Sequence, residues 1–138
     1  MVERELILAT NSYRQRNGLG SLAWSNRLNT ACESLLRVIL ATDNMGHEAD
    51  GRTPADRVSA TGYSWTLVAE NLAMRTGREF MSDTDFAHAI LQQWIDSPGH
   101  NQNLLVPSAT ECGVAVGTNQ ANGKTFAVMI YTATSEAR

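Results

Sequence analysis

The segment Trp94-Ile-Asp-Ser-Pro-Gly-His100-Asn-Gln-Asn-Leu-Leu105 has the pattern of an amphipathic helix that ends, a Pro-Gly break, and the start of a second short helix. A histidine directly after such a break is held in a fixed position by the ends of the two helices. A histidine on the face of a helix would not need such a break. His100 is therefore the first candidate for a functional residue. Taken alone it is weak, because a histidine at a helix end often only caps carbonyl groups or contacts solvent.

Four helices and two strands are predicted around this segment. Apolar residues at helical spacing, N-capping residues and glycine stops predict helices over residues 2–15, from the N-cap Ser25 to Ile39, over residues 54–60, and from Asp83 to Trp94. Alternating residues predict strands over residues 112–118 and 125–134, joined by a hairpin turn at residues 121–124. Residues 63–74 favour a strand, although residues 69–73 also tolerate a helix. Helices packed around a small antiparallel sheet make an α+β fold.

Composition bounds the function classes. With 138 residues, 43% hydrophobic and 18% charged, the chain is expected to form one globular domain over residues 1–138. No apolar run is long enough to predict membrane insertion. The 11 basic and 14 acidic residues give a net charge of −3 without a basic stripe, which argues against nucleic acid as a partner and favours a monomer. The charged start of the chain is not a signal peptide, so the protein is cytoplasmic or has lost a leader.

Two polar residues stand out upstream of His100. His47 lies in a turn-forming stretch, residues 43–51, that predicts a surface loop. Glu70 lies in an apolar run, where an unpaired buried carboxylate would be very costly. A metal ion or a protonated histidine next to Glu70 would compensate the charge of a buried carboxylate.

Cysteines and aromatic residues suggest mostly structural roles. Cys32 and Cys112 are too few for a disulfide scaffold, and both two buried thiols and a bridge between them stay open. Trp24 and Trp94 are predicted to pack helices against the sheet. Three further apolar residues, Trp65, Leu67 and Phe80, are assigned to the core rather than to a lipid pocket.

Many of these residues occur in the order and spacing of the CAP superfamily, which comprises cysteine-rich secretory proteins, antigen 5 allergens and pathogenesis-related proteins. The matching residues are Asn11-Ser-Tyr-Arg14, Gly18-Leu19, Leu22-Ala-Trp24-Ser25, His47, Arg57, Gly62-Tyr63, Glu70-Asn-Leu-Ala73, Trp94, Ser97-Pro-Gly-His100, Asn103-Leu-Leu105, Pro107 and Gly113-Val-Ala-Val-Gly117. The chain resembles a bacterial-type member. Its Ala69 and Asn101 depart from the glycine and arginine that the family usually has at these positions.

This resemblance implies a three-layer α-β-α sandwich, a secreted or periplasmic protein, and a cleft lined by two histidines and acidic residues. That cleft binds zinc or other divalent ions in several members. By position, His47, Glu70 and His100 are the candidate metal ligands. The candidate residues around them are Asn71, Asp96 and Ser97.

Three functions follow from the resemblance. The first is a non-enzymatic binding module that acts on a protein or on cell-envelope material, favoured because no recognisable nucleophile accompanies the histidines. The second is a metal-assisted, peptidase-like hydrolase with Glu70 as a ligand or general base. The third is a lipid or sterol carrier. Against metal binding stands a structural alternative, in which Glu70 hydrogen-bonds the histidines and organises the cleft by itself.

Overall fold

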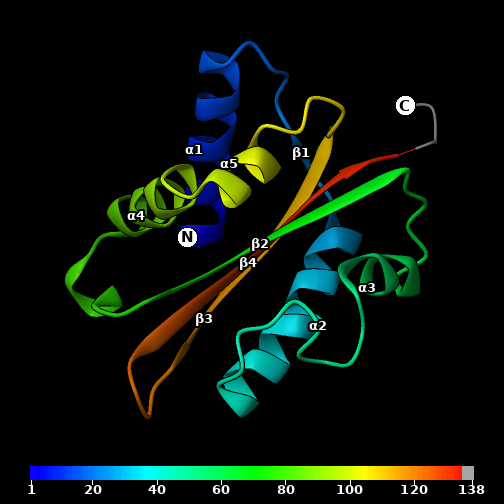
Figure 1. The fold of residues 1–138 in the computed structure, drawn as a ribbon. Helices are drawn as coiled ribbons and strands as arrows, with labels where there is room; N and C mark the ends of the chain where they lie inside the picture. Colours follow the sequence, from blue (N-terminus) through cyan, green and yellow to red (C-terminus); the bar gives the residue numbers. More distant parts are fainter. Residues whose placement is uncertain (135–138) are drawn as a thin grey trace.

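The computed structural model describes residues 1–134, which form helices on both faces of one sheet (Figure 1). The helices are α1 (Val2–Arg16), α2 (Asn26–Thr42), α3 (Pro54–Ala60), α4 (Asp83–Ile95) and α5 (Pro98–Leu104), with a 3-10 helix at Arg78–Phe80. The strands are β1 (Ala23–Trp24), β2 (Leu67–Arg75), β3 (Glu111–Asn119) and β4 (Lys124–Ala133). Their order is β1-β3-β4-β2, with β1 parallel to β3 and the other neighbours antiparallel.

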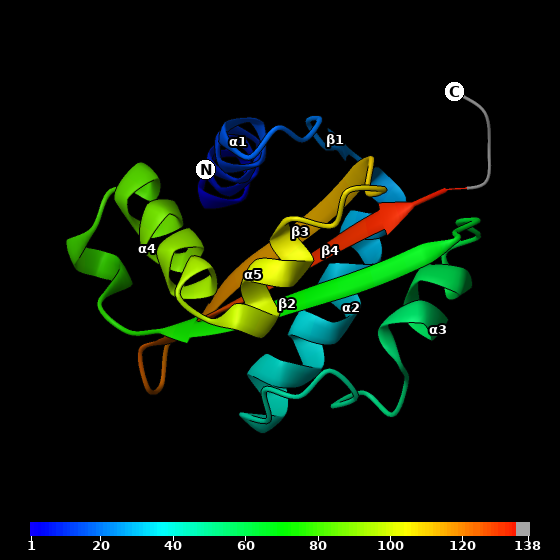
Figure 2. The ribbon, with the colours of Figure 1, turned by 45° about the horizontal axis from the view of Figure 1, so that its top comes forward.

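The sheet separates two apolar cores. Figure 2 shows α1, α4 and α5 on one side of the sheet and α2 and α3 on the other. Because successive side chains of a strand point to opposite faces, Ala73 of β2 joins the first core and Leu72 joins the second. This arrangement confirms the predicted α+β class and the α-β-α sandwich, and it shows that residues 69–73 are strand rather than helix.

Capping residues start the helices where the sequence predicts. The Ser25 hydroxyl accepts a hydrogen bond from the Leu28 amide at the start of α2. Thr53 and Asp56 form a reciprocal capping box at α3. Each cap satisfies amide groups that the first turn of a helix leaves without a partner.

Close packing of β3 against α2 depends on a glycine. A Cβ atom added to Gly113 would lie 2.4 Å from the carbonyl carbon of Leu28 and 2.5 Å from the amide nitrogen of Asn29. The Asn29 side chain also accepts a hydrogen bond from the Val114 amide at 2.9 Å. The strand backbone and the helix backbone are therefore nearly in contact.

A buried arginine fastens the segment after α5. Arg14 of α1 is fully buried and donates hydrogen bonds to the carbonyl groups of Leu104, Val106 and Ala109, and to that of Gly20. Burial lowers the pKa of its guanidinium. This one side chain ties α1 to the chain between α5 and β3.

Several expectations about single residues were wrong. Trp24 is 38% exposed and lies in β1, a strand too short to be seen from sequence periodicity, whereas Trp94 is buried as expected. Phe80 is 86% exposed and Trp65 is 38% exposed, so neither belongs to the core.

The cysteines are both free and buried. Cys32 belongs to the core beneath α2, and Cys112 to the core on the opposite face of the sheet. A bridge between them is therefore not formed. Within residues 1–134, no helix combines the length and the apolar character that crossing a membrane requires.

Candidate functional site

Glu70 lies at the centre of a charged group that we call the Glu70 cluster, made of His47, Asp50, Arg57 and Glu70. Nη2 of Arg57 donates hydrogen bonds to both carboxylate oxygens of Glu70, at 3.0 and 2.8 Å. The Glu70 side chain is 1% exposed and that of Arg57 is fully buried. Arg57 is thus a partner of the buried carboxylate that the sequence did not predict, and His47, a histidine partner of the predicted kind, is the other.

Asp50 balances the same guanidinium from the other side. Nη1 of Arg57 donates to a carboxylate oxygen of Asp50 at 2.8 Å and to the carbonyl oxygen of Arg52 at 2.9 Å. Burial alone would raise the pKa of Asp50, but the Arg52 amide and the charges of Arg57 and Arg52 hold this pKa below its ordinary value. The loop between α2 and α3 is therefore fastened to β2 through Arg57.

His47 is fixed by this same cluster. Its Nδ1 lies 2.8 Å from one oxygen of Glu70, and its side chain is 50% exposed. An ionised carboxylate only accepts hydrogen bonds, so Nδ1 is the protonated nitrogen of this pair. In the neutral ring Nε2 is then the free acceptor. Glu70 orients the imidazole in the way that a carboxylate commonly orients a histidine next to a functional centre.

His100 is held from the opposite face of β2. It lies in the first turn of α5, half-buried, and its carbonyl oxygen accepts a hydrogen bond from Nδ2 of Asn71 at 3.0 Å. Asn71 is fully buried and also donates to the hydroxyl of Tyr131. Because Glu70 and Asn71 are consecutive in β2, their side chains point to opposite faces. Each histidine is therefore attached to β2 from its own layer.

Asn103 hydrogen-bonds both residues of β2 that hold the histidines, Glu70 and Asn71. Its Nδ2 donates to the carbonyl oxygen of Glu70 at 3.1 Å and to Oδ1 of Asn71 at 2.9 Å. Ser97 is the N-cap residue of α5. Asp96 is exposed and accepts a hydrogen bond from Gln92 of α4, so its carboxylate is directed along that helix. Of the three candidate residues around the site, only Asn71 makes a hydrogen bond to a predicted metal ligand.

The residues present do not fit a shared metal ion at Glu70. Both oxygens of Glu70 already accept hydrogen bonds from a cation, and the remaining unsatisfied polar atom here, Nε of Arg57, is a donor that would repel a metal. In the described part of the chain, no three His, Cys, Asp or Glu side chains are grouped so that they could hold a metal ion. A zinc site made of His47, Glu70 and His100 stays a prediction that this geometry does not support.

Comparison with known proteins places the chain in a family. A family model described as "CAP: Cysteine-rich secretory protein family" matches residues 7–131. The chain belongs to the CAP family. The CAP domain is 25% identical to the uncharacterized protein YkwD of Bacillus subtilis (strain 168) over 131 residues, which cover 88% of this chain and 47% of YkwD. It therefore spans about half the length of this curated relative.

Solved structures share the fold of this CAP domain. An outer surface protein from Borrelia burgdorferi superposes with a TM-score of 0.82 at 17% identity, covering 94% of this chain and 90% of that chain. An extracellular protein containing a SCP domain from Bacillus anthracis str. Ames superposes with a TM-score of 0.78 at 24% identity, covering 96% of this chain and 40% of that chain. At these identities the likeness shows the fold alone.

Neither cysteine of the CAP domain is suited to nucleophilic chemistry. Burial raises the pKa of Cys112 to about 12 and raises the pKa of Cys32 well above its ordinary value. A thiol acts as a nucleophile only as the thiolate. Both side chains are therefore inert packing groups at neutral pH.

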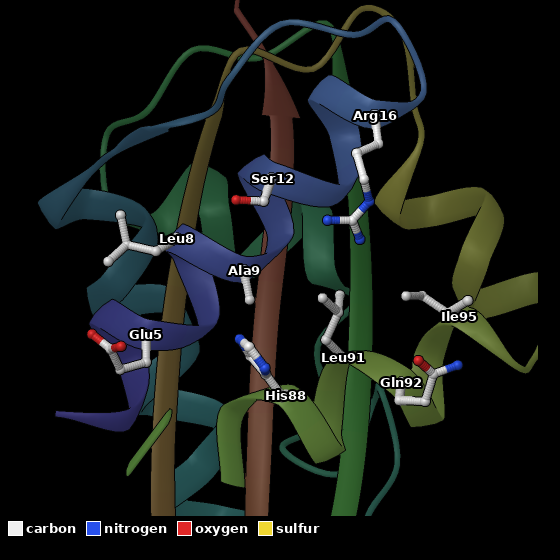
Figure 3. A pocket seen from close by; sticks show the side chains of 9 residues that line it. All are labelled: Glu5, Leu8, Ala9, Ser12, Arg16, His88, Leu91, Gln92 and Ile95. Atoms are coloured by element: carbon white, nitrogen blue, oxygen red, sulfur yellow. The ribbon is translucent and has the colours of Figure 1, made fainter. Parts of the chain in front are cut away.

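A surface groove between α1 and α4 lies away from the Glu70 cluster (Figure 3). It encloses about 340 Å³, with His88 and Arg16 directed toward it from the two helices. The His88 side chain is exposed. The groove is lined by four apolar and five polar or charged side chains, a mixture that does not favour a sterol or a lipid tail. The lining residues are Glu5, Leu8, Ala9, Ser12, Arg16, His88, Leu91, Gln92 and Ile95.

Proposed function

We propose that this CAP domain is a secreted, non-enzymatic binding module whose ligand-contacting surface includes His47. The observation that carries the proposal is the pairing of both Glu70 oxygens with Arg57, which leaves His47 oriented and half exposed. The ligand class that we propose is a protein or cell-envelope material.

The pairing of Glu70 argues against hydrolysis. A general base needs a lone pair within hydrogen-bond reach of the proton that it removes, directly or through one water molecule. Glu70 has two hydrogen bonds from Arg57, one from His47, and a side chain that is only 1% exposed. Activating it would require breaking a buried ion pair, which is costly because the other charge is left without a partner.

The arrangement suits a fixed contact surface instead. His47 is held by a charge-assisted hydrogen bond, so its exposed edge has little conformational freedom to lose when a ligand binds. A preorganised imidazole offers a hydrogen-bond acceptor and a flat apolar face to the ligand. The related proteins described as an outer surface protein and an extracellular protein support placing the module outside the cytoplasm.

Turnover assays test the absence of catalysis. The domain is incubated with casein and with p-nitrophenyl acetate, with zinc and with chelator, alongside the variants His100→Ala and Glu70→Gln. We expect the wild type and both variants to give the same background rate under every condition. Hydrolysis by the wild type that His100→Ala or Glu70→Gln abolishes would overturn the proposal.

A further inference from the structure

In the described part of the chain, strand β3 has no neighbouring strand on its outer side along most of its length. In the sheet order β1-β3-β4-β2, only β1 lies outside β3, and its pairing stops at Trp24 opposite Cys112 (Figure 2). Strand β3 continues to Asn119. Beyond the end of β1, no strand of residues 1–134 lies beside it.

The direction of the free backbone groups follows from two hydrogen bonds. The carbonyl oxygen of Cys112 accepts from the Ser25 amide, and the Val114 amide donates to the Asn29 side chain, so both groups point away from β4. Backbone groups of alternate residues in a strand point to the same side. The N–H and C=O groups of Val116 and Thr118 therefore also face the open edge.

This edge lies in a groove rather than on a flat rim. A hollow of about 430 Å³ follows β3 between the start of α1 and the side of α2. A second hollow of about 310 Å³ continues toward the β3–β4 turn and shares three of the residues, Met1, Glu3 and Val116. A strand added to a sheet lies about 4.8 Å from its neighbour, so a peptide paired with Val116 and Thr118 would lie in this groove.

The groove has apolar walls and charges of both signs. The Met1 ammonium and the Arg78 guanidinium lie along it, but both pair with Asp83. Trp24 is 38% exposed at the end next to β1, and Leu36 and Val116 line the floor. Glu3 of α1 and Glu33 of α2 place carboxylates on its two sides. Because α1 and α2 lie on opposite faces of the sheet and successive side chains of a strand point to opposite faces, two adjacent basic residues would place one next to Glu3 and the other next to Glu33. Apolar residues that flank this pair would contact Val116.

We propose that the open edge of β3 binds an extended peptide segment of a partner protein by strand addition, with basic residues of that segment next to Glu3 and Glu33. Backbone hydrogen bonds to Val116 and Thr118 supply the affinity, and the groove walls supply the preference for two adjacent basic residues flanked by apolar ones. A second copy of this chain is the poorer occupant. Its own β3 edge is recessed between the same helices, and its acidic groups would face those of the first copy. This surface is separate from the Glu70 cluster.

A peptide titration tests the proposal. The probe is a fluorescein-labelled peptide of about seven residues, two adjacent lysines flanked by valines, which matches the length of β3 beyond its pairing with β1. We expect saturable binding by fluorescence anisotropy, and slower amide exchange at Val116 and Thr118 when the peptide is bound. No saturable binding would overturn the proposal.

Matched variants separate strand addition from simple charge attraction. Val116→Pro removes an outward N–H without removing a hydrogen bond of the sheet, and we expect it to weaken binding roughly tenfold. The control, Val116→Thr, retains the N–H and should bind like the wild type. Glu3→Gln and Glu33→Gln should each weaken binding about threefold, the size expected of an exposed ion pair.

Two further readouts keep the test decisive if Val116→Pro does not fold. The same peptide methylated on every backbone nitrogen cannot form a ladder, so equal binding of this peptide to the wild type would contradict strand addition. A peptide with glutamate in place of lysine should bind more weakly, and equal binding would contradict the basic partner. Sedimentation velocity measures whether the wild type forms a dimer. A wild-type dimer that is lost in Val116→Pro would show that a second copy of this chain, rather than a partner peptide, occupies the groove, and would contradict the proposal.

Discussion

At the scale of single residues, Arg57 joins the parts of the site. Its buried guanidinium lies between the carboxylates of Asp50 and Glu70, and through them it fixes the loop that carries His47. Removing one member of a buried charge pair leaves the other charge without compensation. The stability of this part of the fold should therefore depend strongly on this one side chain.

Arg57→Met tests this dependence. We expect the free energy of unfolding to fall by about 3–5 kcal/mol, because two buried carboxylates lose their cation. Urea denaturation at pH 7 measures the change. Arg52→Met is the matched control, since the Arg52 side chain is 42% exposed, and it should cost less than about 1 kcal/mol. Equal effects of the two substitutions would contradict the role of Arg57.

Cys112 makes a second prediction at this scale. Its pKa is about 12 in the folded protein because of burial, whereas a thiol in an unfolded chain titrates near about 8.5. Below about pH 8.5 the thiol is neutral in both states, and above it only the unfolded state ionises, so stability falls as pH rises toward 12. By pH 10 this one thiol should remove about 2 kcal/mol.

Urea denaturation under reducing conditions at pH 7 and pH 10 measures this loss. The comparison is between the wild type and Cys112→Ala, which retains Cys32 and every other titrating group. The wild type should lose more free energy of unfolding between pH 7 and pH 10 than the variant does. We expect the difference between the two losses to be about 2 kcal/mol, the contribution of the Cys112 thiol. An identical pH dependence in both proteins would show that Cys112 ionises as easily in the folded state as in the unfolded chain.

At the scale of secondary-structure elements, the backbones of α2 and β3 are nearly in contact. The backbone of Gly113 lies against that of Leu28 and Asn29, so a side chain at position 113 would meet main-chain atoms. Main-chain atoms in a helix cannot rotate away as a flexible side chain can. The two elements would have to separate, and the core that contains Cys32 would open with them.

Gly113→Ala should therefore lower the free energy of unfolding by about 1–3 kcal/mol or more, the usual cost of overpacking. Gly117→Ala is the control on the same strand. A Cβ atom there would lie 3.1 Å from side-chain atoms of Leu36 and Leu40, which can shift, so its cost should stay below about 1 kcal/mol. Chemical denaturation of both variants measures the two losses of stability. A Gly113→Ala protein as stable as Gly117→Ala would contradict the close approach of the β3 backbone to the α2 backbone.

At the scale of the whole molecule, the local features of the sequence predicted most of the architecture. Helix starts followed from capping residues such as Ser25 and Thr53, and the β3–β4 hairpin followed from alternation around a turn. Strand β1 was missed because two residues carry no periodicity. Phe80 was misplaced because a single apolar residue, here at the end of a short 3-10 helix, does not indicate burial by itself.

The candidate site was predictable only in part, for a physical reason. The sequence indicated that a buried Glu70 needs a partner, but it does not say which cation reaches it. Arg57 lies 13 residues earlier, in a different element, and the two meet only when α3 packs against β2. The structure brings His47 next to Glu70, whereas the contact of His100 with β2 is made through its backbone carbonyl and Asn71.

A crystal structure of the domain soaked in zinc chloride tests the central claim, that Glu70 is an anchor for His47 rather than a metal ligand. The account predicts that Arg57 remains hydrogen-bonded to both oxygens of Glu70 and that no zinc density contacts this carboxylate. Zinc bonded to an oxygen of Glu70 at about 2.0–2.2 Å, with Arg57 displaced, would contradict it.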